Sequence, residues 1–141
     1  MPTPPDFPRF RNLVIDCLAP RALAGFYSEL LGLPYLLRDG QTEPDDDWAV
    51  LRDPDTGLRL AFQEVPELAE STWPEPAVPP QLHLDFSVPS MAELDRAHER
   101  AVGLGARLLF DQTEDDAEEQ IRIYADPAGH PFCLFVLPAD A

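Results

Sequence analysis

The chain has few positive charges. Its 141 residues include 10 lysines and arginines together against 26 aspartates and glutamates, and the formal net charge is −16 at pH 7. A surface of this sign repels phosphate backbones and anionic lipids, so the composition argues against nucleic-acid and membrane partners. Solubility is the simplest explanation of the acidity itself.

Cysteine and long apolar runs are also scarce. Cys17 and Cys133 lie in different halves, each inside an apolar run, which is typical of buried thiols in a reducing compartment rather than of a disulfide framework. No segment approaches the roughly 18 apolar residues of a membrane span, and the first residues contain no apolar stretch of signal-peptide length. We therefore expect a cytoplasmic protein. The 45% of hydrophobic residues suffices for one packed domain over residues 1–141.

What the chain does contain is an internal repeat. An Asp-Pro turn at residues 53–57 precedes one apolar run, and an Asp-Pro turn at residues 126–129 precedes another. Each follows a helix-like segment that ends in Leu-Gly, at residues 31–32 and 104–105. A repeat of this kind indicates two copies of one structural unit.

The first module spans residues 10–66. Alternation predicts a strand over residues 10–18, with Leu13 and Ile15 on one face and Asn12 and Val14 on the other. A helix then begins at Pro20 and ends at Gly32. Three strands follow, at residues 34–37, 48–52 and 58–65.

The second module spans residues 81–138, after a proline-rich linker at residues 66–80. A strand over residues 82–88 places His83, Asp85 and Ser87 on one face. Ser90 is expected to cap the next helix, with Glu93 completing a capping box. Strands at residues 106–110, 120–125 and 131–137 complete the same order of elements.

This pattern predicts an α+β fold of two strand–helix–three-strand modules. The helices cover one face of each sheet, and the other faces are left to form a concave wall. Such a wall, lined by alternate residues of the strands, is a natural small-molecule cleft.

The ordered set of motifs resembles the vicinal oxygen chelate superfamily, and within it the glyoxalase-like, bleomycin-resistance-related and dioxygenase-like proteins. The motifs are Phe26-Tyr27, Leu31-Gly32, the segment 83–86 and the segment 126–133, and the resemblance covers residues 10–138. It implies curved mixed sheets around the cleft, helices outside and, in many members, a homodimer. It also implies either a divalent metal that holds vicinal oxygens of a substrate or, as in bleomycin-binding members, sequestration without chemistry.

The resemblance carries the superfamily's metal positions onto four residues of this chain. His83 matches the usual ligand, and Asn12 is a weak ligand through its carbonyl oxygen. Cys133 stands where glutamate is usual, and Ala61 cannot ligate an ion. Since magnesium and manganese prefer hard oxygen ligands, we expect no metal cofactor held by Asn12, His83 and Cys133.

The alternative is a divalent metal such as zinc at these residues. A zinc site needs about three protein ligands, and Asp85 is a candidate for the third. It is equally a candidate for the residue that orients the His83 imidazole. The same pair, His83 and Asp85, is the candidate general base with its carboxylate helper, because side chains two apart on a strand share a face.

Further ligand-binding residues follow from the alternation in the later strands. If Ile121 and Ile123 face the helix, Arg122 and Tyr124 face the cleft and grip an anionic or aromatic ligand. Gln63 is expected to join them. His98 lies among charged helix residues and is expected to be exposed to solvent. The polar side chain of His130 is expected to satisfy backbone groups of its turn.

Two functions therefore remain open at this point. In the first, the protein binds or sequesters an aromatic or polyoxygenated small molecule at Asn12, Gln63, His83, Arg122, Tyr124 and Cys133. In the second, it is a lyase, isomerase or dioxygenase that uses a metal or His83. The missing glutamate and Ala61 favour the first.

Overall fold

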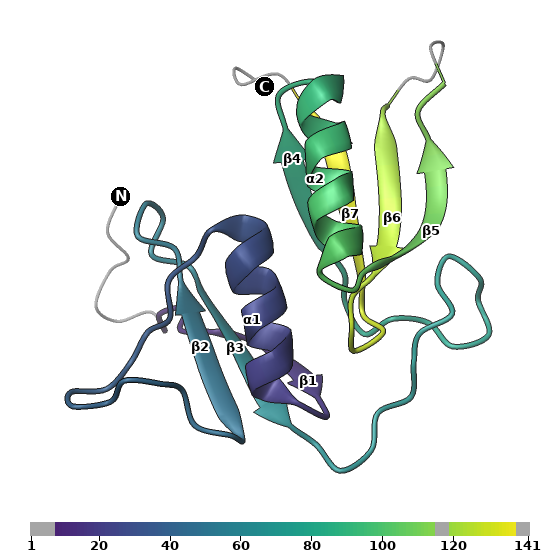
Figure 1. Cartoon of the computed structure of the whole chain (residues 1–141). Coiled ribbons are helices and arrows are strands. Elements are labelled where there is room, and N and C mark those ends of the chain that lie inside the picture. Colours follow the sequence, from purple (N-terminus) through teal and green to yellow (C-terminus); the bar gives the residue numbers. More distant parts are fainter. Residues whose placement is uncertain (1–7, 115–118, 138–141) are drawn as a thin grey trace. The chain divides into compact units, whose positions relative to one another are not determined.

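The computed structural model describes residues 8–114 and 119–137 (Figure 1). The chain divides into two compact units, Met1–Pro66 and Glu67–Ala141. Among the described residues, no helix is both long enough and apolar enough to cross a membrane.

The first unit contains one helix and one mixed sheet. Its elements are β1 (Leu13–Cys17), α1 (Pro20–Leu31), β2 (Trp48–Arg52) and β3 (Arg59–Glu64). The strand order is β1-β3-β2, with β1 parallel to β3 and β2 antiparallel to β3. Hence the first and last strands of the unit are neighbours, although a helix separates them in sequence.

The second unit repeats this plan with one more strand. Its elements are β4 (Leu84–Val88), α2 (Met91–Gly103), β5 (Arg107–Gln112), β6 (Ile121–Ala125) and β7 (Pro131–Val136). The strand order is β4-β7-β6-β5, and β4 is parallel to β7. The α+β class expected from the sequence is confirmed.

The strand expected over residues 34–37 is wrong. Within this segment only Tyr35 pairs, as an isolated bridge to Leu51 on β2. Leu36 N donates to Val50 O at 2.8 Å, and Arg52 N donates to Pro34 O at 3.1 Å. Proline offers no N–H, so the segment cannot form a full ladder. It still lies beside β2 as β5 lies beside β6, so the repeat of strand positions is kept.

Local signals explain where the helices begin and end. Pro20 occupies the first turn of α1, and Gly32 ends the helix in the left-handed conformation with φ 69°. Ser90 Oγ accepts a hydrogen bond from Glu93 N at 3.2 Å at the start of α2. The second half of the expected capping box is absent among the described hydrogen bonds, since the Glu93 carboxylate instead pairs with Arg96.

Strand registers decide which residues share a face with which helix. Tyr27 of α1 stacks on Phe62 with ring centroids 5.8 Å apart, so α1 covers the face that carries Phe62 and its paired residue Ile15. We call the opposite face of each sheet, turned away from its own helix, the distal face. In the first unit the strand residues on the distal face, with Asn12 just before β1, are Asn12, Val14, Asp16, Trp48, Val50, Arg52, Arg59, Ala61 and Gln63.

In both Asp-Pro turns the aspartate carboxylate accepts hydrogen bonds from residues further along the turn. The Asp126 carboxylate accepts hydrogen bonds from Ala128 N at 2.8 Å and His130 N at 3.0 Å. The Asp53 carboxylate accepts from Asp55 N at 2.9 Å and from Thr56 Oγ1 at 2.8 Å, and these bonds lower the pKa of Asp53. An aspartate that binds backbone N–H groups further along the turn fixes the hairpin entry locally.

Two glycines test how the turns and caps stabilise the fold. Gly32→Ala should destabilise the protein by about 1–2 kcal/mol, the cost of a left-handed non-glycine residue. No steric cost is added, since no atom lies within 4 Å of the new methyl group. Gly129→Ala should cost more, since its φ is 91° and its Cβ would overlap the Glu70 side chain. Urea unfolding measures the free energy of unfolding of both variants. An equal loss of stability in the two would contradict a steric overlap with Glu70.

Candidate functional site on the second unit

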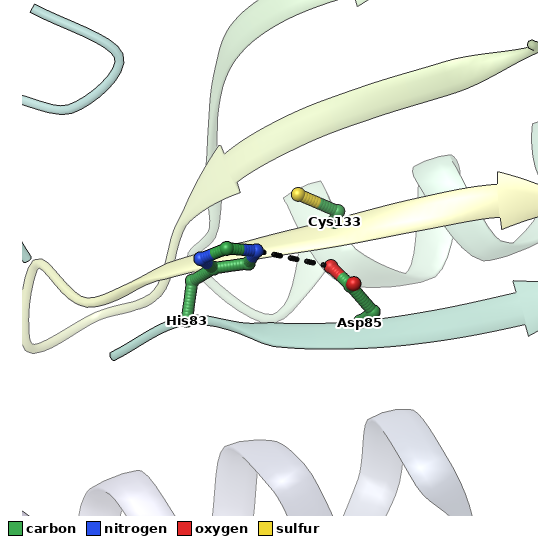
Figure 2. A group of neighbouring side chains, drawn as sticks. All are labelled: His83, Asp85 and Cys133. Atoms are coloured by element: carbon green, nitrogen blue, oxygen red, sulfur yellow. Dashed lines mark ion pairs between the residues drawn. The ribbon is translucent and has the colours of Figure 1, made fainter.

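Three metal- and proton-binding side chains meet on the distal face of the second sheet. His83 directly precedes β4, Asp85 lies on β4, and Cys133 lies on β7 (Figure 2). His83 and Asp85 are two residues apart and share a face. Asp85 is paired directly with Cys133 in the parallel ladder, so the register itself brings the carboxylate beside the thiol.

The geometry of this cluster is tight. His83 Nε2 lies 3.4 Å from Asp85 Oδ1, an ion pair when the imidazole is protonated. One ligand atom from each of His83, Asp85 and Cys133 lies within 4.8 Å of the other two. The His83 and Asp85 side chains are 37% and 55% exposed, whereas Cys133 is 1% exposed. A ligand can therefore reach the imidazole and carboxylate, while the thiol forms the floor.

A tryptophan from the proline-rich segment covers one side of His83. The Trp73 and His83 rings stack with centroids 4.7 Å apart and an interplanar angle of 16°. The same segment is attached to the sheet by Glu70, whose carboxylate binds Arg107 at 3.0 Å. Residues 66–80 are free of helix and strand, as expected, but part of the segment packs on the second unit. The position of Trp73 could not be predicted from the sequence, because the path of a segment without periodicity has no sequence signal.

The environment of Cys133 keeps its thiol protonated. Burial, the negative charge of Asp85 and a hydrogen bond to Asp85 raise the pKa of Cys133 to about 12. In an unfolded chain a cysteine titrates near about 8.5. The neutral thiol thus contributes stability below about pH 8.5, and this contribution is lost as the pH rises towards about 12. At neutral pH Cys133 is a hydrogen-bond donor and not a nucleophile.

The donor set can be compared with what different metals require. Manganese and magnesium prefer several hard oxygen ligands, and here only Asp85 supplies an anionic oxygen. One imidazole, one carboxylate and one thiol match zinc in type and in number, because a zinc site that keeps an open position uses about three protein ligands. The cluster fits a zinc-like ion once the thiol loses its proton and does not fit manganese.

Arg122 and Tyr124 do not face the site, and the expected orientation of β6 is wrong. Tyr124 Oη is hydrogen-bonded to His98 Nδ1 of α2 at 2.7 Å. Arg122 Nη1 binds Asp95 of α2, and Arg122 Nε binds Asp111 of β5, both at 3.2 Å. These contacts place both side chains on the face covered by α2, so the isoleucines occupy the distal face.

His98 also differs from the expectation that it lies in solvent. It is half-buried and bonded to Tyr124, whose pKa burial raises to about 12. His130 follows the Asp126 turn, and its backbone N–H binds the Asp126 carboxylate. The role in the turn expected of the His130 side chain stays a prediction.

Asn12 and Gln63 lie on the distal face of the first sheet, as expected. Gln63 Nε2 donates to Asp16 Oδ1 at 3.2 Å, whereas the buried Asn12 Oδ1 has no hydrogen-bond partner among the described residues. The registers also support the correspondence between modules, since Val14 pairs with Ala61 as Asp85 pairs with Cys133. The Asp85 and Cys133 donors of the second unit are thus replaced by apolar side chains in the first, while Asn12 stands at the position of His83. Ligand contact by Asn12 and Gln63 stays a prediction.

Two duplicated units, each with a parallel first and last strand and one helix between them, define the paired-module fold. The sequence model of the family described as glyoxalase-like domain matches residues 12–135. The chain belongs to this family.

Solved structures of related proteins have the same fold. The fosfomycin-resistance protein FosX from Mesorhizobium loti is 13% identical, with a TM-score of 0.65 over 95% of this chain and 96% of that chain. A glyoxalase/bleomycin resistance protein/dioxygenase family enzyme from Burkholderia phytofirmans PsJN is 15% identical, with a TM-score of 0.66 over 89% and 95%. A mutant of FosX from Listeria monocytogenes, complexed with Mn(II) and 1S,2S-dihydroxypropylphosphonic acid, is 16% identical, with a TM-score of 0.67 over 95% of each chain.

The effect of Asp85 on Cys133 can be tested by the rate of thiol alkylation. Asp85→Asn removes the negative charge that helps raise the Cys133 pKa, so alkylation of Cys133 by iodoacetamide at pH 9 should become faster. Ser87→Asn, on the same face of β4, is the matched control and should leave the rate unchanged. Peptide mapping by mass spectrometry separates Cys133 from Cys17. Equal rates in wild type and Asp85→Asn would show that the carboxylate does not act on the thiol.

Proposed function

We propose that the protein binds a small molecule at the distal face of the second unit, with His83 as its main polar contact, and that this binding needs no metal. The supporting observation is the partly exposed His83–Asp85 pair beside Trp73. An imidazole held by a carboxylate donates or accepts a directed hydrogen bond, and the indole provides an apolar wall. Aromatic and polyoxygenated molecules offer both kinds of contact.

The state of Cys133 supports binding without a metal. A metal ligand must be a thiolate, and here burial and the neighbouring Asp85 carboxylate raise the pKa of the Cys133 thiol to about 12. Metal binding would have to remove the proton of the Cys133 thiol. It would also have to draw Asp85 away from its contact with His83. The FosX neighbour complexed with Mn(II) does not change this reasoning, because the donor set of this chain is poor in hard oxygen ligands.

The second candidate function is metal-dependent chemistry of the lyase, isomerase or dioxygenase kind. The observation that favours it is the convergence of three different donors within 4.8 Å. His83, Asp85 and Cys133 would hold a zinc-like ion, which would act as a Lewis acid on a substrate oxygen. Homodimer formation, implied by the family resemblance, also stays a prediction.

Cobalt titration separates the two candidates. With chelator-treated protein near pH 7, the proposed function predicts no cobalt–thiolate charge-transfer absorption at stoichiometric Co²⁺, because Cys133 keeps its proton. A saturable band that disappears in Cys133→Ser would instead establish the metal site. Cys17→Ser is the control for the second buried thiol.

The imidazole itself is tested by ligand affinity. For a ligand found by fragment screening against wild type, His83→Ala should weaken binding by about 1–3 kcal/mol, the cost of one buried polar contact. His98→Ala is the matched control, because His98 lies on the opposite face of the sheet. Isothermal titration measures both, with circular dichroism to confirm folding. An affinity indifferent to His83→Ala would place the ligand elsewhere.

A further inference from the structure

The first unit contains a pocket that the site around His83 does not explain. The pocket has a volume of about 220 Å³ and lies beside β2, β3 and the loop after residue 35. Trp48, Val50 and Arg59 line it from the distal face of the sheet, and Leu36 lines it from the neighbouring segment. Two further arginines, Arg11 and Arg38, complete its positive lining.

This concentration of positive charge is unusual for the chain. The sequence has no lysine, so its ten positive residues are all arginines, and three of them line one small pocket. The only acidic residue of the lining is Asp45, and Arg38 pairs with it at 3.1 Å. Among the residues that line the pocket, none of the other side chains is an acid that could compensate Arg11 and Arg59.

Neither of these two arginines has an ion-pair partner in the part of the chain that the structure describes. In contrast, Arg21, Arg96, Arg107 and Arg122 each bind a carboxylate. Arg59 Nε is buried and has no hydrogen-bond partner among residues 8–114 and 119–137. A buried donor without a partner costs free energy, and an oxyanion ligand would supply the acceptor.

The pairing of β2 with β3 adds a second destabilising interaction at the same place. Arg59 on β3 is paired directly with Arg52 on β2, so two like charges face each other across the strands. Opposed like charges destabilise a sheet. The corresponding pair in the second unit is Pro131 and Ala125, which carry no charge. The arginine pair is therefore a property of the first unit and not a requirement of the repeated fold.

We propose that this pocket binds a small organic anion, whose oxyanion is held by Arg11 and Arg59 and whose apolar body lies against Trp48. The planar guanidinium group presents paired N–H donors to a carboxylate or a phosphate-type group. Leu36 and Val50 extend the apolar wall. The volume is below the about 300–1,000 Å³ of drug-sized pockets, so the ligand is small. This inference does not rest on the function proposed for the second unit.

The two tryptophans make the experiment specific, because Trp48 lies in this pocket and Trp73 lies beside His83. In the Trp73→Phe background, Trp48 is the only tryptophan and reports on the pocket alone. The probes are cyclohexanecarboxylate, neutral cyclohexanecarboxamide and inorganic phosphate, titrated at constant ionic strength. We expect saturable quenching or enhancement with the carboxylate and at least about 10-fold weaker binding of the amide, because hydrogen bonds between charged groups are the stronger ones.

Variants identify the groups that hold the anion. Arg59→Gln should weaken carboxylate binding about 10-fold or more, Arg11→Gln should weaken it less because Arg11 is exposed, and Arg59→Lys should give an intermediate value. Arg100→Gln changes the net charge equally on the exposed surface of α2 and should have no effect. The thermal midpoint of Arg59→Gln should not fall, since the change removes the like-charge pair with Arg52.

The outcomes are exclusive. Arginine-dependent binding of the carboxylate supports the proposal, and equally tight arginine-dependent binding of phosphate supports it with a phosphate-type ligand. Equal affinity for carboxylate and amide in the Trp73→Phe protein would overturn it without any arginine variant. So would the absence of saturable binding of both anions, or an equal loss in Arg100→Gln.

Discussion

The parallel pairing of the first and last strands in each unit is the constraint on which the candidate site depends. Parallel neighbours cannot be joined by a tight hairpin, so the chain crosses over through a helix that covers one face of the sheet. The distal face then receives every second residue of the strands. In the second unit this pairing places Asp85 beside Cys133, with His83 two residues away on the same face. In the first unit the same pairing places Val14 beside Ala61, so two of the three equivalent positions carry no donor and only Asn12, at the position of His83, offers a polar side chain.

The two halves have therefore kept one backbone plan while their distal faces differ in chemistry. The second unit gathers an imidazole, a carboxylate and a thiol, groups that exchange protons or bind cations. The first unit gathers guanidinium groups around an apolar wall, which is suited to anions. In a chain of net charge −16, the arginine-lined pocket is a region of local positive charge. Since the backbone plan is satisfied without either group of side chains, neither is required for folding by the repeat itself.

The order of elements could be predicted from local signals, while side-chain orientation in the apolar strands could not. Pro20, Gly32 and Ser90 act within one turn of chain, and their effects are visible in the sequence. In β6, both Ile123 and Tyr124 are buried, so alternation carries no information about which faces the helix. That choice is made by pairing with β7, where Tyr124 lies opposite Phe132 and turns towards His98. The stacking of Trp73 on His83 likewise depends on the path of a segment without periodicity.

Strand β7 shows how sensitive the donor set is to chain length. Its residues are apolar on both faces, with Phe132 and Leu134 towards α2 and Cys133 and Phe135 on the distal face. Hydrophobicity alone therefore does not fix its alignment, and the preceding turn held by Asp126 does. Gain or loss of one residue in that turn would preserve the composition of the strand yet rotate the thiol into the helix interface. An insertion or deletion in a turn could thus remove a donor from this site with every ligand-type residue still present in the sequence.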